Sequence, residues 1–131
     1  MRARAKRASV QFDGELRRAA AGRRTVTYGH LMEKFGLSRG RQFSALLGEV
    51  DRAERLVGAP GFAAIVVRRD TGFPGGGYFC DDELPAALRR PASRCTDPRL
   101  SAEEREHVRK QQRRIWRYYG KGGGRDPRAT T

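Results

Sequence analysis

Arginine is the residue whose number and spacing offer the clearest chemistry in this sequence. Four arginines recur at every fourth position near the C-terminus, which places them on one face of a helix: Arg105, Arg109, Arg113 and Arg117. Arg68 and Arg69 stand beside a turn signal, and Arg39, Arg41 and Gln42 open another expected helix. Guanidinium groups bind phosphate oxygens and the edge of guanine through paired N–H donors. These residues are therefore the candidate contacts to a polyanion.

The charge of the whole chain supports that interpretation. The 131 residues carry a formal net charge of +13. Residues 1–24 hold eight basic and two acidic side chains, and residues 101–131 hold nine and four, whereas residues 25–100 hold eleven and nine. Such a field attracts nucleic acid. The distribution predicts a nearly neutral folded centre with basic ends.

Groups for catalysis or metal binding are few. His30 is expected in a helix and His107 in the basic helix, where a solvent-facing role is commoner than that of a base. Three adjacent carboxylates at 81–83 rarely converge on one ion. The two cysteines, Cys80 and Cys95, lack the close spacing of zinc ligands and do not form a disulfide framework. We therefore expect no metal, no cofactor and no catalytic residue. The sequence favours a protein that is not an enzyme.

The elements that position the arginines begin with a predicted helix over residues 9–22. Ser9 is its expected N-cap, Phe12 and Leu16 lie on its apolar face, and Gly22 stops it. Residues 1–8 are expected to form a disordered basic arm.

Two short helices follow. Thr27 is the expected N-cap of the first, whose apolar residues recur at helical spacing: Tyr28, Leu31, Met32 and Phe35. Gly36 ends it, and Ser38 begins a second helix that runs to about residue 57 and repeats the spacing with Phe43, Leu46, Leu47 and Val50. Taken alone, these residues fit a helix-turn-helix and a plain helical hairpin equally well.

The next segment favours the helix-turn-helix. Residues 62–68 are apolar and β-branched, residues 70–72 signal a turn, and residues 73–79 suit a return strand kinked at its glycines. The expected fold class is therefore α+β, with a winged helix-turn-helix-like domain over residues 9–80. Arg68 and Arg69 would sit on its wing.

The C-terminal part is expected to add a basic helix. Residues 81–99 contain three prolines and are predicted to be a linker. Ser101 and Glu104 form a capping box at the start of an amphipathic helix over residues 100–119. Its inner face carries Val108, Gln112, Ile115 and Tyr119, and residues 120–131 form a glycine-rich basic tail.

Three motifs resemble the DNA-binding domain of alkylguanine-DNA alkyltransferases and alkyltransferase-like proteins: Thr27-Tyr-Gly-His-Leu31, Arg41-Gln-Phe-Ser-Ala-Leu-Leu-Gly48, and Pro60 leading into Ile65-Val-Val67. The resemblance covers about residues 25–80 and implies a recognition-helix arginine at Arg41, or at Arg39 in another register. That family has Cys-His-Arg after the proline, whereas this chain has Gly61-Phe62-Ala63. The resemblance therefore implies a domain that lacks the alkyl-accepting thiol, with alkylated duplex as a candidate ligand.

The preferred hypothesis is a non-catalytic nucleic-acid-binding protein whose partner is duplex DNA. One alternative is a small basic nuclease or toxin-like enzyme that uses Tyr28, His30 or the carboxylates at 81–83. Another is an RNA- or ribosome-associated protein in which Trp116, Tyr118 and Tyr119 stack on bases. No segment approaches membrane-spanning length, and two cysteines with no secretory signal suggest the cytoplasm.

Overall fold

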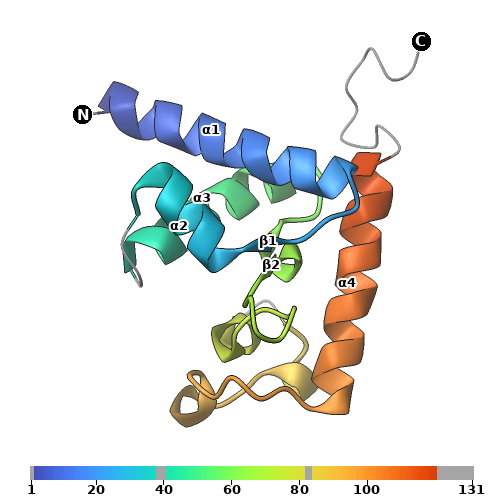
Figure 1. Ribbon diagram of the computed structural model, residues 1–131. Coiled ribbons are helices and arrows are strands. Elements are labelled where there is room, and N and C mark those ends of the chain that lie inside the picture. The colour runs from blue at the N-terminus through green and yellow to red at the C-terminus, as the bar shows by residue number, and fades with distance from the viewer. Residues whose placement is uncertain (1, 38–40, 82–83, 121–131) are drawn as a thin grey trace.

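The computed structural model describes residues 2–37, 41–81 and 84–120, with the backbone alone at residues 2–8, 41 and 76. Within these residues, four α-helices surround a parallel sheet of two short strands (Figure 1). The helices are α1 (Arg2–Ala21), α2 (Tyr28–Phe35), α3 (Arg41–Leu56) and α4 (Ala102–Gly120). The strands are β1 (Val26–Thr27) and β2 (Val66–Val67). The expected α+β class is confirmed at this coarse level.

Helix α1 lies across α2 and α3, and its C-terminal end meets the end of α4 (Figure 1). Phe12 and Leu16 are fully buried, and the Phe12 ring packs 5.4 Å from Phe35 and 5.9 Å from Phe43, measured between centroids. The helix begins at Arg2 rather than at Ser9. Alanine, arginine and lysine dominate residues 2–8 and favour helix, and no glycine or proline interrupts them. The segment expected to be a disordered arm is therefore helical backbone.

Helix α2 has the caps that the sequence predicts. Thr27 Oγ1 accepts a hydrogen bond from His30 N at 3.1 Å, and Gly36 closes α2 in the left-handed region with φ of 62°. Gly58 has φ of 83° after α3. Helix α3 begins at Arg41, and the expected cap Ser38 lies outside the described residues.

The expected β-hairpin over residues 62–79 is wrong. Strand β2 pairs in parallel with β1, with Val26 opposite Val66 and Thr27 opposite Val67. The predicted return strand instead ends in a 3₁₀ turn, Gly76–Cys80. Pro74 lacks an N–H donor and the glycines after it disfavour extended pairing. The turn is closed at Arg68, whose N donates to Phe73 O at 2.9 Å and whose O accepts from Gly72 N at 2.9 Å. A wing of two strands is therefore absent from the described part of this segment.

Helix α4 closes the other side of the core (Figure 1). The predicted capping box is confirmed: Ser101 N donates to Glu104 Oε1 at 2.8 Å, and Glu104 N donates to Ser101 Oγ at 3.1 Å. The predicted inner face is confirmed as well, because Val108, Gln112, Ile115 and Tyr119 are all buried. Gln112 Nε2 donates to the carbonyl of Ala64 at 3.0 Å, which satisfies that buried amide.

A partly buried polar cluster joins three helices. The Tyr119 hydroxyl lies 2.7 Å from Glu54 Oε1 and 3.0 Å from the Pro60 carbonyl, to which it can donate. Arg17 of α1 pairs with Glu54 at 2.7 Å and with Asp13 at 2.8 Å. Burial, together with the neighbouring Glu54 carboxylate, raises the pKa of Asp13 to about 6. These contacts fix α1 and α4 against α3.

The segment between residues 81 and 99 is more than a linker. A disulfide joins Cys80 to Cys95, and short 3₁₀ turns occupy Ala86–Leu88 and Ala92–Arg94. Arg90 is buried beneath them and pairs with Glu104 at 2.7 Å. None of the helices in the described ranges has the length and apolar character needed to cross a membrane.

Candidate nucleic-acid interface

The structure places only some of the predicted contacts at the start of α3. Arg39 lies outside the described residues, and the side chain of Arg41 does as well. Gln42 is exposed in the first turn of α3, and that turn contains no acidic residue. The positive end of a helix dipole without a nearby carboxylate attracts phosphate. Among the described residues, the first turn of α3 therefore suits an anion, while the predicted contacts of Arg39 and Arg41 stay predictions.

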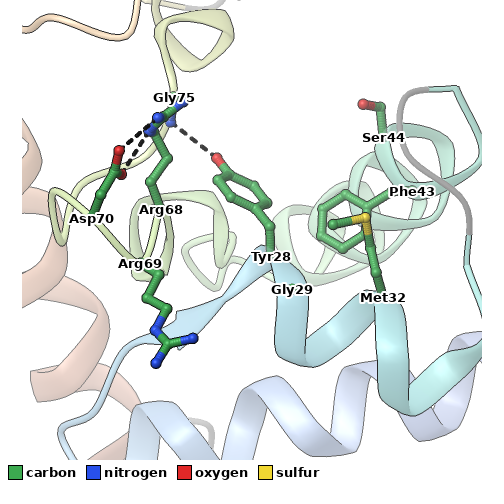
Figure 2. Close-up of a pocket in the computed structure, with 9 residues that line it drawn as sticks. All are labelled: Tyr28, Gly29, Met32, Phe43, Ser44, Arg68, Arg69, Asp70 and Gly75. Atoms are coloured by element: carbon green, nitrogen blue, oxygen red, sulfur yellow. Dashed lines mark hydrogen bonds and ion pairs between the residues drawn. The ribbon is translucent and has the colours of Figure 1, made fainter.

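Arg68 and Arg69 differ in what they can offer a ligand. Arg68 forms two hydrogen bonds with Asp70, from Nε to Oδ1 at 2.9 Å and from Nη2 to Oδ2 at 2.8 Å (Figure 2). This pair neutralises the guanidinium of Arg68. Arg69 points away from the pair and is exposed, and none of the described residues forms an ion pair with it (Figure 2). Arg69 is thus the better phosphate contact of the two.

A hollow of about 550 Å³ lies between the segment that carries Arg68 and Arg69 and the start of α3. Tyr28, Met32 and Phe43 line it, and the rings of Tyr28 and Phe43 meet at a centroid distance of 5.5 Å (Figure 2). The hydroxyl of Tyr28 accepts a hydrogen bond from Gly75 N at 3.1 Å, which ties the loop to α2. The hollow therefore has an apolar floor, with Arg69 and the first turns of α2 and α3 around it.

The arginines of α4 lie on one helix but have different surroundings. Arg105 donates to the carbonyl of Leu100 at 2.6 Å, and Arg113 lies 3.6 Å from a Glu106 oxygen. The guanidinium of Arg109 lies 5.3 Å from the centre of the Phe73 ring, so it meets the same loop that carries Arg69. Arg117 is exposed, and the described part of the chain gives it no carboxylate partner. We call Arg69, Arg109, Arg113 and Arg117 the arginine surface.

The loop after α1 joins this surface, which the sequence did not predict. Trp116 Nε1 donates to the carbonyl of Arg24 at 3.0 Å, so the loop is held against α4. Arg23 and Arg24 are both exposed there. Two adjacent arginines in a short loop indicate a contact to phosphate, but the sequence alone does not show which helix the loop contacts.

The residues considered for catalysis are not brought together. His30 Nε2 lies 3.1 Å from Glu15, which also binds Lys34 at 2.8 Å and Arg18 at 2.9 Å. Those hydrogen bonds, the one from Lys34 foremost, lower the pKa of Glu15 to about 2. Tyr28 instead bonds Gly75, and of the carboxylates at 81–83 only Asp81 lies within the described residues. No group of three potential metal ligands occurs in the described ranges.

The three aromatic residues considered for base stacking differ in burial. Tyr119 is buried and stacks on Phe62 with ring centroids 5.0 Å apart. Trp116 uses its indole N–H to hold Arg24. Trp116 and Tyr118 are half-buried, and the Tyr118 ring packs against that of Tyr119 with centroids 4.9 Å apart.

Gly61, at the position where the resembled family carries cysteine, has no room for a side chain. The Asp51 carboxylate accepts hydrogen bonds from Phe62 N at 2.6 Å and from Ala63 N at 3.2 Å. Burial raises the pKa of Asp51 to about 6. A Cβ atom at position 61 would lie 2.6 Å from Asp51 Cγ. Both cysteines of the chain are joined in the disulfide, so this form has no free thiol.

Substituting Gly61 with alanine is expected to destabilise the fold by about 1–3 kcal/mol, because the new methyl group displaces Asp51. Gly48→Ala is the matched control: a Cβ at position 48 meets only the far end of Arg52, at 4.0 Å. That change should stabilise α3 by about 0.5–1 kcal/mol, since glycine weakens a helix interior. Urea denaturation of both variants measures the difference. A Gly61→Ala protein as stable as the parent would contradict the packing described here.

A comparison of this chain with family models, with curated proteins and with solved structures finds no match.

Proposed function

We propose that this chain is a non-catalytic nucleic-acid-binding protein whose ligand is duplex DNA. One observation carries the proposal: a net charge of +13 combined with an arginine surface in which Arg69, Arg109 and Arg117 have no carboxylate partner among the described residues. Unpaired guanidinium groups from separate segments can neutralise several phosphates at once, and this supplies most of the affinity of nonspecific nucleic-acid binding.

Helices α2 and α3 suit the role of a helix-turn-helix within this proposal. They are short and are joined by a turn that begins at Gly36. A helix-turn-helix presents the N-terminal residues of its second helix to the major groove. Gln42 and Ser44 are exposed at that end of α3, and Ser44 lines the hollow that Arg69 borders. The loop carrying Arg69 takes the place of a wing, although it is a tight turn rather than a strand pair.

Substitution of Arg41 tests whether α3 is a recognition helix. Arg41→Ala should weaken binding to a duplex, and a bidentate contact to guanine would add about 1–3 kcal/mol of discrimination between sequences. Arg52→Ala is the matched control, because Arg52 is exposed on the same helix and carries the same charge. Fluorescence anisotropy with duplex DNA and with structured RNA measures both variants. If Arg41→Ala binds every nucleic acid as tightly as the parent, α3 is not a recognition helix. Tighter binding of RNA than of DNA would favour the RNA-associated alternative.

Alkyl transfer is not part of the proposal. After incubation with a duplex containing alkylated guanine, the intact mass of the protein should be unchanged, with or without a reductant. The reductant matters because it would release the thiols of Cys80 and Cys95 from their disulfide. A mass gain of one alkyl group on either cysteine would overturn this expectation.

We propose the cytoplasm as the compartment. Cytosolic thiol reductants oppose disulfides, so this location implies that Cys80 and Cys95 are reduced in the cell. The hydrogen bonds of Arg90 hold the same segment independently of the disulfide.

A further inference from the structure

The guanidinium of Arg17 is shared by two carboxyl groups from different helices. Its Nε donates to Asp13 Oδ2 of α1 at 2.8 Å, and its Nη2 donates to Glu54 Oε2 of α3 at 2.7 Å. These two nitrogens form one edge of the guanidinium, and that edge matches the two oxygens of a single carboxylate. The oxygens of Asp13 and Glu54 that bind it therefore lie next to each other.

Two other arginines of this chain use the same edge for a single carboxylate. Arg68 donates from Nε and Nη2 to the two oxygens of Asp70. Arg90 donates from the same two nitrogens to the two oxygens of Glu104. In both pairs one cation neutralises one carboxylate. At Arg17 the edge faces two carboxyl groups, so ionisation of both would leave one negative charge uncompensated.

Little solvent reaches this cluster to compensate the charge. The Glu54 side chain is 6% exposed and the Asp13 side chain 25%. Within the described residues, the ion pairs of both carboxyl groups are with Arg17. Helix α4 contributes the neutral hydroxyl of Tyr119, which lies 2.7 Å from Glu54 Oε1. Two adjacent carboxyl groups in such a setting do not both ionise readily, and one of them keeps its proton.

We propose that Asp13 and Glu54 share one proton, and that this proton controls the stability of the contact between α1, α3 and α4. The proton resides chiefly on Asp13, because the Tyr119 hydroxyl donates to Glu54 and favours its ionised form. In that state Asp13 donates to Glu54, and the cluster is neutral as a whole. Loss of the proton places a net negative charge where the three helices meet. The proposal does not depend on nucleic-acid binding.

The proton is lost near neutral pH. Burial, together with the hydrogen bond and the charge of Glu54, raises the pKa of Asp13 from 3.8 to about 6. The folded protein therefore holds the proton more tightly than the unfolded chain does. The resulting stabilisation is complete below pH 3.8 and is lost as the pH rises through 6.

Asp51, one turn away on α3, adds pH dependence of the same sign. Burial raises its pKa to about 6, while the amides of Phe62 and Ala63 and the charge of Arg55 oppose the shift. A pH profile of the parent alone would combine both sites. The contribution of Asp13 is therefore obtained as a difference between variants that all retain Asp51.

The test compares the pH dependence of unfolding in two variants. Asp13→Asn replaces the protonated carboxyl with a neutral group of the same shape, and its amide can still donate to Glu54. Between pH 5 and pH 8, the unfolding equilibrium constant of the parent should rise about tenfold more than that of Asp13→Asn. Asp70→Asn is the control and should follow the parent, because Asp70 is exposed and its hydrogen bond with Arg68 lowers its pKa.

A second measurement uses the parent alone and holds even if Asp13→Asn does not fold. A carboxyl-detected NMR titration should show coupled changes at Asp13 and Glu54 near pH 6. Titration of both carboxyl groups below pH 5 would overturn the proposal. Equal pH dependence of unfolding in the parent and in Asp13→Asn would overturn it as well, since the pair would then have a structural role without a shared proton.

Discussion

Arg90→Ala should destabilise the protein by about 3–5 kcal/mol, because the change leaves a buried carboxylate without its partner. The guanidinium donates from Nε to Glu104 Oε2 at 2.7 Å and from Nη2 to Glu104 Oε1 at 2.8 Å. Its remaining N–H groups reach the carbonyls of Arg94, Asp97 and Arg99. One side chain therefore organises the segment before α4 and also holds the capping box of that helix.

The control is the neighbouring residue. Arg89 is exposed, so Arg89→Ala should change the free energy of unfolding by less than about 0.5 kcal/mol. Urea denaturation with the disulfide intact and with it reduced measures both variants. Equal stability of the two variants would contradict the contribution assigned here to the contacts of Arg90.

Phe43→Ala should destabilise the protein by a similar amount, about 3–5 kcal/mol. The Phe43 side chain is 5% exposed and its ring contacts those of Phe12 and Tyr28. Its loss would open a cavity where α1, α2 and α3 meet, and it would remove part of the apolar floor of the hollow near Arg69. Gln42→Ala, at the exposed neighbouring position, serves as the control for local helix effects. A Phe43→Ala protein that melts with the parent would contradict this placement of the core.

The helices and their caps were predictable because their signals are local. The spacing of Tyr28, Leu31 and Met32 and the cap at Thr27 need only neighbouring residues, and all of these are observed. The parallel pairing of β1 with β2 was not predictable, because each strand has two residues and its partner lies forty positions away. The apolar residues at 62–65 favour a strand, yet Asp51 draws two of their amides toward α3 and the chain turns there.

For the candidate site, the positions of the arginines along the helix were predictable, but their partners were not. Four-residue spacing placed the arginines of α4 on one helix, and that helix is observed. Which arginines are already paired depends on tertiary neighbours that spacing does not reveal. Asp70 forms a salt bridge with Arg68, and the guanidinium of Arg109 packs on the ring of Phe73. The role of Arg90 was invisible for the same reason, since its partners come from four separate residues.

The salt dependence of duplex binding tests the proposed function most directly. The association constant should fall steeply and linearly with salt on logarithmic axes, and each phosphate that is no longer neutralised should flatten the slope by about 0.9. The double variant Arg69→Gln/Arg109→Gln should therefore flatten the slope by about 1.8. The control Arg89→Gln/Arg94→Gln removes the same charge from exposed positions outside the arginine surface and should leave the slope unchanged. Equal slopes for the parent and the Arg69→Gln/Arg109→Gln variant, or no measurable duplex binding by the parent, would contradict the account.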